Sequence, residues 1–271
     1  MRRSNGIKTF MLVLASLLLQ VPTIYAQDDE LTIHRQMIGV GSSSILDTYL
    51  SQEHYRGQEV RFIDHTIRPH SGKHWSTQLV HQAYVSYTSP RSDDNTDVAG
   101  MYSFGLSRHR NWTLDGGKLE LRAGIEGMAN LGFLYNMGNG NNPAQARLSA
   151  TIGPNATAYY QFKLWQKAFR VRYEVGAPLL GVAFSPNFGQ SYYEIFTRGN
   201  YDNNIKLTHP LNSPSLRQLL TLEFNLRKTT VSVGYLGDYQ QADLNLIKYH
   251  NYSHMLVIGL VKRLQIKSFT L

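Results

Sequence analysis

The chain has 271 residues, a formal net charge of +8 and no cysteine. Without cysteine it can form neither a disulfide framework nor a thiolate metal site. Its lysines and arginines are dispersed rather than clustered, which disfavours a nucleic-acid partner. The first 26 residues carry three of the positive charges, so the remainder has a formal charge of +5.

Residues 1–26 have the layout of a cleavable secretory signal. Three basic residues precede an apolar stretch, and the small residue Ala26 comes just before polar Gln27. The uninterrupted apolar stretch is too short for a transmembrane helix, which needs about 20 residues. We therefore expect export of the chain and a mature domain of residues 27–271, in which no cofactor is predicted.

Beyond the signal, the sequence repeatedly alternates apolar and polar residues. In GKLELRAGIEGMANLGFLYN, residues 117–136, the apolar side chains fall mainly on odd numbers and the charged, polar or small ones on even numbers. A period of two is the period of a β-strand. No later segment has the roughly 18 consecutive apolar residues of a membrane helix. The predicted strands, in chain order, are residues 33–43, 57–68, 74–88, 97–110, 117–135, 143–164, 168–182, 214–227, 229–240 and 251–266.

These ten segments are joined by links that alternate between short and long. Short periplasmic turns and longer external loops are typical of outer-membrane β-barrels, and many of the runs exceed the usual globular strand length. The sequence thus predicts an all-β, antiparallel transmembrane β-barrel of about ten strands. A further hairpin hidden in residues 183–213 would make twelve, and a soluble β-sandwich is the competing fold. Gly153-Pro154 predicts a bulge or bend in the sixth strand, with a tight turn as the alternative.

Charged side chains on the polar faces of these strands would line the barrel interior. Their mixed signs predict a paired network that fills a narrow lumen, because barrels of about eight strands are filled by side chains whereas wide channels need about sixteen. A wide porin is therefore disfavoured. The predicted lumen network consists of Glu120, Arg122, Glu126, Arg147, Arg170, Arg172, Glu174, Arg217, Glu223 and Arg227.

Two weak catalytic patterns occur. Ser107 and His109 are two apart in a predicted strand, so their side chains share a face and could form part of a hydrolase site. Both are expected to point inward, away from lipid, which makes a polar pair in the lumen the stronger interpretation. Asp94 lies in an acidic external loop where carboxylates could activate water or bind Ca²⁺. Acidic loops are more often simply solvated, and no metal site is predicted.

The longest predicted link follows the seventh strand. Loops of about 30 residues are uncommon and often functional, so this one is a candidate ligand-binding surface or constriction. A lid that packs over the barrel mouth is the alternative. The candidate ligand-binding residues are Ser185, Asn187, Gln190, Ser191, Tyr192, Tyr193 and Glu194.

Several segments resemble an uncharacterised family of secreted, cysteine-free proteins from Bacteroidota, known only as a domain of unknown function. The resemblance rests on residues 46–51, Gly57, Phe184-Ser185-Pro186, residues 189–194 and Gly234-Tyr235, and it spans most of the mature chain. It implies an envelope protein of the outer membrane and brings no activity with it.

Together these observations predict an exported outer-membrane barrel that contacts lipid and is inserted by the barrel-assembly machinery. A structural or ligand-binding role through external loops is favoured over enzymatic activity, and the external ligand is not specified by the sequence. A hydrolase acting on lipid or peptide is the first alternative, and a narrow solute channel is the second.

Overall fold

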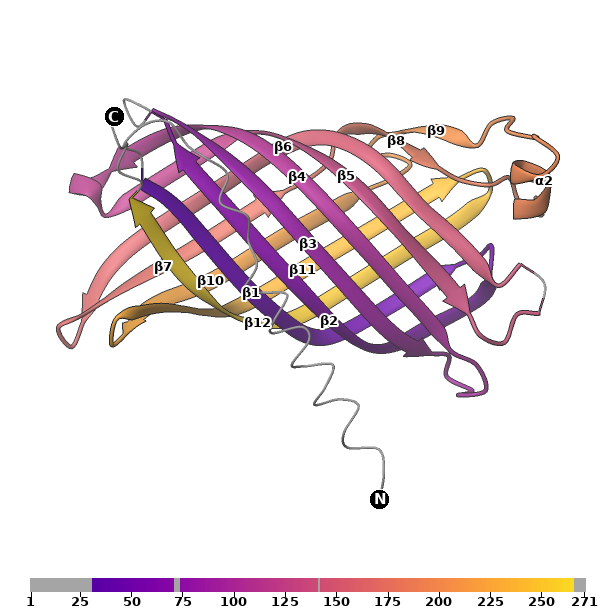
Figure 1. The fold of residues 1–271 in the computed structure, drawn as a ribbon, viewed down its shortest axis with the longest axis horizontal. Coiled ribbons are helices and arrows are strands. Elements are labelled where there is room, and N and C mark those ends of the chain that lie inside the picture. Colours follow the sequence, from indigo (N-terminus) through magenta and orange to yellow (C-terminus); the bar gives the residue numbers. More distant parts are fainter. Residues whose placement is uncertain (1–30, 71–73, 141, 266–271) are drawn as a thin grey trace, which may run out of the picture. The chain divides into compact units, whose positions relative to one another are not determined.

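A computed structural model describes residues 31–70, 74–140 and 142–265 of the chain. The predicted signal, residues 1–26, lies outside the described residues. Ten long antiparallel strands form the wall of a closed barrel (Figure 1). They are β1 (Leu31–Asp47), β2 (Ser51–Pro69), β3 (Trp75–Ser89), β4 (Asp97–Leu114), β5 (Leu119–Asn136), β6 (Ala144–Leu164), β7 (Lys167–Gly176), β10 (Ser215–Leu226), β11 (Thr229–Leu244) and β12 (Ile247–Gln265).

Closure comes from pairing between neighbours all around the wall. Strands β1 to β7 follow each other in sequence order, β10 joins β7, and β12 pairs with β1 from Leu31↔Gln265 to Asp47↔Tyr249. The predicted ten-stranded antiparallel barrel is confirmed. The alternative of a hidden hairpin is also realised, because β8 (Leu180–Phe184) and β9 (Ile205–Thr208) extend one part of the wall. The short helices are η1 (Asp115–Gly117) and α2 (Tyr192–Phe196).

The strand period sorts side chains between the two faces of the wall. Along β12, the odd-numbered residues from Asn251 to Val261 are buried inside, while Leu256, Ile258 and Leu260 are exposed outside. The outer face of β12 is thus apolar, whereas the outer face of a soluble barrel is mainly polar. Among the residues that the structure describes, no helix is both long enough and apolar enough to cross a membrane.

The predicted link lengths need correction at two places. Residues 44–56 and 241–250 were expected to be long loops, but the strands continue into both segments. The β1–β2 link is a turn at residues 48–50, and the β11–β12 link is a two-residue turn in which Asn245 and Leu246 both have positive φ. The asymmetry between the two ends of the barrel therefore rests mainly on the link between β7 and β10.

The bend predicted at Gly153-Pro154 lies in the middle of an uninterrupted β6. Opposite it, β7 ends at Gly176 and the chain resumes as β8 at Leu180, still paired with β6. The register changes by one residue between the pairs Asn155↔Gly176 and Ile152↔Leu180, which is a bulge. A Cβ atom on Gly153 would lie 2.1 Å from the carbonyl oxygen of Ala177, so the close approach of the two strands requires glycine there.

We expect a charge on the outer face to destabilise the barrel according to its depth. Ile258→Arg, near the middle of β12, should cost about 2–4 kcal/mol in a bilayer, whereas Leu264→Arg near the strand end should cost about 0–1 kcal/mol. Urea unfolding of the protein refolded in lipid vesicles measures both. Equal effects for the two variants would contradict a lipid-facing outer surface.

Candidate functional site

A first cluster of buried charges lies inside the barrel around Arg61. This side chain is fully buried, and its Nη2 lies 2.7 Å from Glu59 Oε1 while its Nη1 donates to Asp238. Ser253 donates to the second oxygen of Glu59 at 2.6 Å. The Arg61 guanidinium also sits 4.7 Å from the centre of the Tyr84 ring. One cation thus neutralises two buried carboxylates drawn from β2 and β11.

A second cluster is centred on Glu174. Arg172 Nη2 donates to Glu174 Oε2, and Arg217 Nη1 donates to Glu174 Oε1 at 3.2 Å. Gln78 adds a hydrogen bond of 3.1 Å, and His65 Nδ1 lies 3.2 Å from Arg172 Nη2. These residues come from β2, β3, β7 and β10. The cluster therefore connects walls of the barrel that are not neighbours in the sheet.

A third ion pair, Arg35 to Glu223, spans 2.5 Å and is nearly inaccessible to solvent. Tyrosines on the inner face contribute further cation–π contacts. Arg122 lies 5.0 Å from the centre of the Tyr159 ring, and Arg147 lies 3.3 Å from that of Tyr249. A guanidinium over an aromatic face is favoured most when both are desolvated.

The predicted lumen residues are placed as follows. Arg122, Glu126, Arg172, Glu174 and Glu223 are buried on the inner face, and Arg147 and Arg217 are largely buried there. Glu120 pairs with Arg122 at 2.6 Å and is partly exposed, and Arg170 is half-buried. Arg227 is the exception, because it lies exposed in the β10–β11 turn with φ of 56°. The strand ends at Leu226, so the alternation no longer sets its direction.

The interior also contains apolar layers that the charge pattern did not predict. One buried cluster joins Met37, Ile63, Leu219, Leu236, Met255 and Val257, and a second lies around Ile45 and Leu134. Leu219 and Leu236 fall on the polar-side positions of their strands, which is the signal by which they could have been recognised. The inward direction of Tyr84, Tyr159 and Tyr249 was not predicted either. Tyrosine in a barrel strand is more readily assigned to the bands of aromatic residues that lie at the two membrane interfaces.

Ser107 and His109 are both buried inside the barrel, but they use different partners. Ser107 donates to Glu126 Oε1 at 3.3 Å, and His109 Nε2 lies 2.9 Å from Asn155 Oδ1. Asn155 in turn donates to Glu126 Oε2 at 3.2 Å. A hydrolase needs the base in contact with the nucleophile. Here the carboxylate contacts the serine and the histidine is held by an amide.

Asp94 lies in the β3–β4 loop and accepts a hydrogen bond of 2.7 Å from Ser92 Oγ. Within the part of the chain that the structure describes, no group of three or more histidine and carboxylate side chains is arranged to hold a metal ion. The structure therefore gives Asp94 a local role in its own loop.

The candidate ligand-binding residues between β8 and β9 bond mainly to each other and to the barrel. Ser191 caps α2 through a capping box with Glu194, and the Ser191 amide and hydroxyl hold the pKa of that carboxyl below its ordinary value. Burial raises the pKa of Tyr192 to about 12, and its hydroxyl accepts from the Ala146 amide. Gln190 is buried and donates to the Asn200 carbonyl.

The remaining candidates in this link also bond mainly within the link. Ser185 is buried and its carbonyl accepts from Asn204 Nδ2, and Asn187 bonds to Gln190 and to the Asp202 carbonyl. Tyr193 is the exposed member of the set. The candidate residues thus mainly hold a packed cap together.

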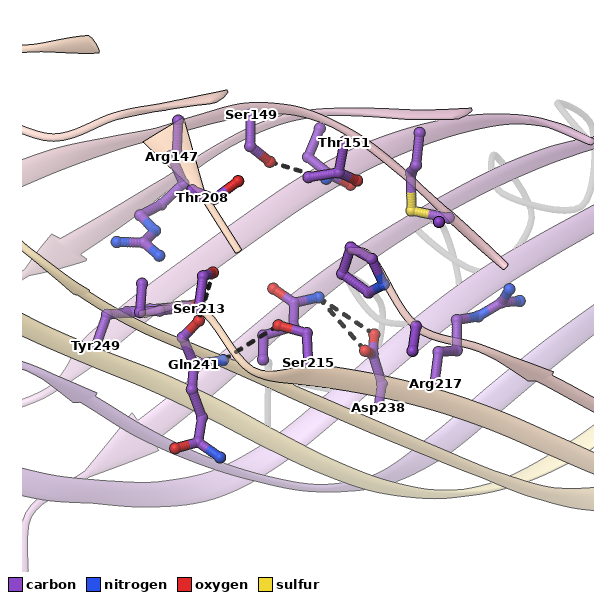
Figure 2. Close-up of a pocket in the computed structure, with 18 of the residues that line it drawn as sticks. Arg147, Ser149, Thr151, Thr208, Ser213, Ser215, Arg217, Asp238, Gln241 and Tyr249 are labelled. Carbon is purple, nitrogen blue, oxygen red and sulfur yellow. Dashed lines mark hydrogen bonds between the residues drawn. The ribbon is translucent and has the colours of Figure 1, made fainter. Parts of the chain in front are cut away.

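A cavity of about 140 Å³ lies beneath this cap, where β8 continues the wall beside β6 and the chain no longer pairs with β10 (Figure 2). Inner-face residues such as Met101, Met128 and Asp238 line it, together with Arg147 and Arg217 near its ends. Cavities of similar size in proteins hold a small apolar molecule such as benzene. Sequence patterns did not reveal this cavity, because its walls come from strands far apart in the chain.

A family model described as a protein of unknown function (DUF3316) matches residues 9–269. The chain belongs to this family. The predicted membership of an uncharacterised family is therefore confirmed, while its Bacteroidota origin stays a prediction. A search of curated proteins finds no match to this DUF3316 chain.

Solved structures similar to the DUF3316 barrel are outer-membrane proteins. The transport unit of the autotransporter AIDA-I from Escherichia coli is 10% identical, with a TM-score of 0.44 and coverage of 96% of this chain and 99% of that one. An outer-membrane channel from Pseudomonas putida F1 is 7% identical, with a TM-score of 0.39 and coverage of 90% and 100%. Ail from Yersinia pestis is 9% identical, with a TM-score of 0.27 and coverage of 87% and 100%. Similarity at this level carries no argument about activity.

We expect Arg61→Met to destabilise the barrel by about 3–5 kcal/mol, because it leaves Glu59 and Asp238 buried without their counter-ion. Adding Glu59→Gln and Asp238→Asn should recover most of the loss. The single and the triple variant are compared by urea unfolding in lipid vesicles. The folded fraction at each urea concentration is read from the mobility of the unheated protein on a denaturing gel. A triple variant no more stable than Arg61→Met would contradict the assigned pairing.

Proposed function

We propose that this protein is an outer-membrane barrel with a sealed lumen, which binds an external ligand at the end that carries α2. The observation that carries the proposal is the set of buried ion pairs centred on Arg35, Arg61 and Arg172. Arg35 and Arg61 pair with carboxylates on strands that are not their neighbours in the sheet, and Arg172 pairs with Glu174 on its own strand, which Gln78 reaches from β3. A continuous water path would solvate these side chains, whereas all three arginines are at most 1% exposed.

Its location in the outer membrane is supported by three features. The outer face is apolar, the wall is closed, and both ends of the barrel domain lie at the end opposite α2. Longer links at one end are typical of the external side in such barrels. We infer that the exported chain is inserted by the barrel-assembly machinery, and that membrane lipid is its constant partner.

A non-enzymatic role is favoured over the hydrolase alternative. The burial and separate hydrogen-bond partners of Ser107 and His109 support a structural role for both. The Asp94 carboxylate accepts a hydrogen bond from Ser92 in its own loop. The cavity beneath the cap is the feature best suited to hold a ligand, because it joins apolar surface to arginine side chains.

We expect the purified protein to be silent in planar lipid bilayers. Arg35→Ala combined with Glu223→Ala removes both members of one ion pair and much of the side-chain volume there, so this variant should produce current steps. Heat-modifiable migration on a denaturing gel checks that each protein is folded. Stepped currents from the unmodified protein would favour the narrow-channel alternative and overturn the sealed lumen.

Detergent-folded protein should show no lipase, phospholipase or protease turnover above background. The matched variants are Ser107→Ala, His109→Ala and Asp94→Asn, which change the candidate groups one at a time. Turnover that any of these substitutions abolishes would replace the binding role with the hydrolase.

A further inference from the structure

The hydrogen-bonded wall has a seam between β9 and the β10–β11 pair. On the side of the seam away from α2, β7 and β10 are paired, and their last pair is Gly176↔Arg217. Beyond that pair, toward α2, the chain continues beside β6 as β8, and β9 pairs with the other edge of β8. Within the described part of the chain, β9 is the last strand in the sheet order and no backbone ladder joins it to β10 or β11. The barrel is therefore closed by backbone pairing in one half and by other means at the seam.

Prolines and side chains define this seam. Pro178 lies between β7 and β8, and Pro214 immediately precedes β10, so neither position can donate a hydrogen bond across the gap. The two sides are instead linked by isolated hydrogen bonds. Asn245 Nδ2 donates to the Asn203 carbonyl at 2.9 Å, Ser213 Oγ donates to the Gln241 carbonyl at 2.8 Å, and the Asp243 amide donates to the Asn212 carbonyl at 2.7 Å. A few isolated bonds are easier to open than a strand ladder.

The cavity reaches both faces of the wall at this seam. Its lining includes Met101 and Met128 from the inner face and Leu216 from the outer face. The outer rim is apolar, because Ile205 and Leu207 of β9 and Leu216 of β10 are all exposed. An apolar molecule dissolved in the membrane would meet this rim without crossing water. Methionine side chains adapt readily to the shape of such a guest.

The inner end of the cavity offers a cation with free donors. Arg147 lies against the Tyr249 ring, and its nearest carboxylate oxygen, on Asp47, is 3.8 Å away (Figure 2). Its guanidinium makes no hydrogen bond with other described residues. The side chain is 18% exposed, so a ligand can reach it. A guanidinium fork that is held in place and retains open donors suits a carboxylate.

We propose that the seam is a lateral entrance through which a single-chain carboxylate amphiphile with a chain of medium length, such as a medium-chain fatty acid, passes from the membrane into the cavity. Its hydrocarbon chain lies between the apolar rim and the methionines, and its carboxylate meets Arg147. This inference rests on the proposed binding role and names the class of ligand.

The probe is a medium-chain fatty acid with a diazirine near its methyl end, added to the protein in lipid vesicles and activated by light. Mass spectrometry then locates the attached label. We expect it on cavity residues such as Met101, Met128 and Leu216. Labelling spread evenly over the outer face would overturn the proposal. A phospholipid with the same diazirine chain, tested separately, distinguishes free fatty acid from a bilayer acyl chain, and equal cavity labelling by both would overturn the preference for a free acid.

Two substitutions of the same kind test the cavity itself. Ala183→Phe fills it from the inner face of β8, and we expect cavity labelling to fall about tenfold. Ala150→Phe adds the same ring to the outward face of neighbouring β6 and should change labelling by less than about twofold. A fall of equal size in both variants would contradict the cavity as the site.

Arg147→Gln tests the polar end. It should lower labelling by the fatty acid about tenfold while leaving labelling by the corresponding diazirine alcohol nearly unchanged, because a neutral head does not need the charge. Equal losses for both probes would show that Arg147 shapes the cavity without recognising the carboxylate.

The seam can be closed with a thiol crosslink. The natural chain has no cysteine, so a thiol reagent reacts only with cysteines that are introduced. Cysteines introduced at Asn203 and Asn245 are joined with a short bifunctional thiol reagent that a reductant can cleave. Joining them should abolish cavity labelling and reduction should restore it, with each single-cysteine variant as control. Labelling that persists in the joined protein overturns lateral entry.

Currents measured on the same vesicles keep the two proposals apart. Silent vesicles without cavity labelling overturn only the lateral-entry inference. Stepped currents overturn the sealed lumen on which the binding role rests.

Discussion

The need to pair every backbone N–H and C=O group inside a membrane governs this structure. Each unpaired group in hydrocarbon costs several kcal/mol, so a spanning sheet has to close on itself. Ten strands achieve this through the β12–β1 and β5–β6 pairings. The same requirement makes the break above Gly176 informative. There the wall departs from β10, and the hairpin of β8 and β9 with its side-chain bridges covers the gap.

Closure at ten strands leaves an interior of limited width, and side chains fill it. Buried charges are tolerated where an opposite charge lies close by, and here each central arginine meets one or two carboxylates. Apolar clusters separate these ionic groups along the lumen. The alternation of ionic and apolar layers resembles the packed core of a soluble protein more than the wetted bore of a porin. This packing supports the proposed sealed lumen.

Much of this fold follows from local pattern. Alternation placed all ten wall strands because lipid outside and a packed lumen inside impose opposite chemistries on successive residues. It failed where that contrast disappears. Strand ends beyond the bilayer lose the apolar signal, so the turns at residues 48–50 and Asn245–Leu246 were taken for long loops. Arg227 keeps the polar parity but follows the last residue of its strand. Leu219 and Leu236 show that inward positions accept apolar residues wherever they pack together.

The seam depends on register between strands distant in sequence, which no local pattern encodes, yet Gly153 and Pro178 mark its position. Gly153 permits the contact that keeps β6 beside the chain after β7 ends, and Pro178 removes a donor on the opposite edge. An apolar rim lies outside the seam, a cavity lies behind it, and an arginine with open donors lines that cavity. The proposed amphiphile would find at this one place both apolar surface for its chain and a cation for its carboxylate.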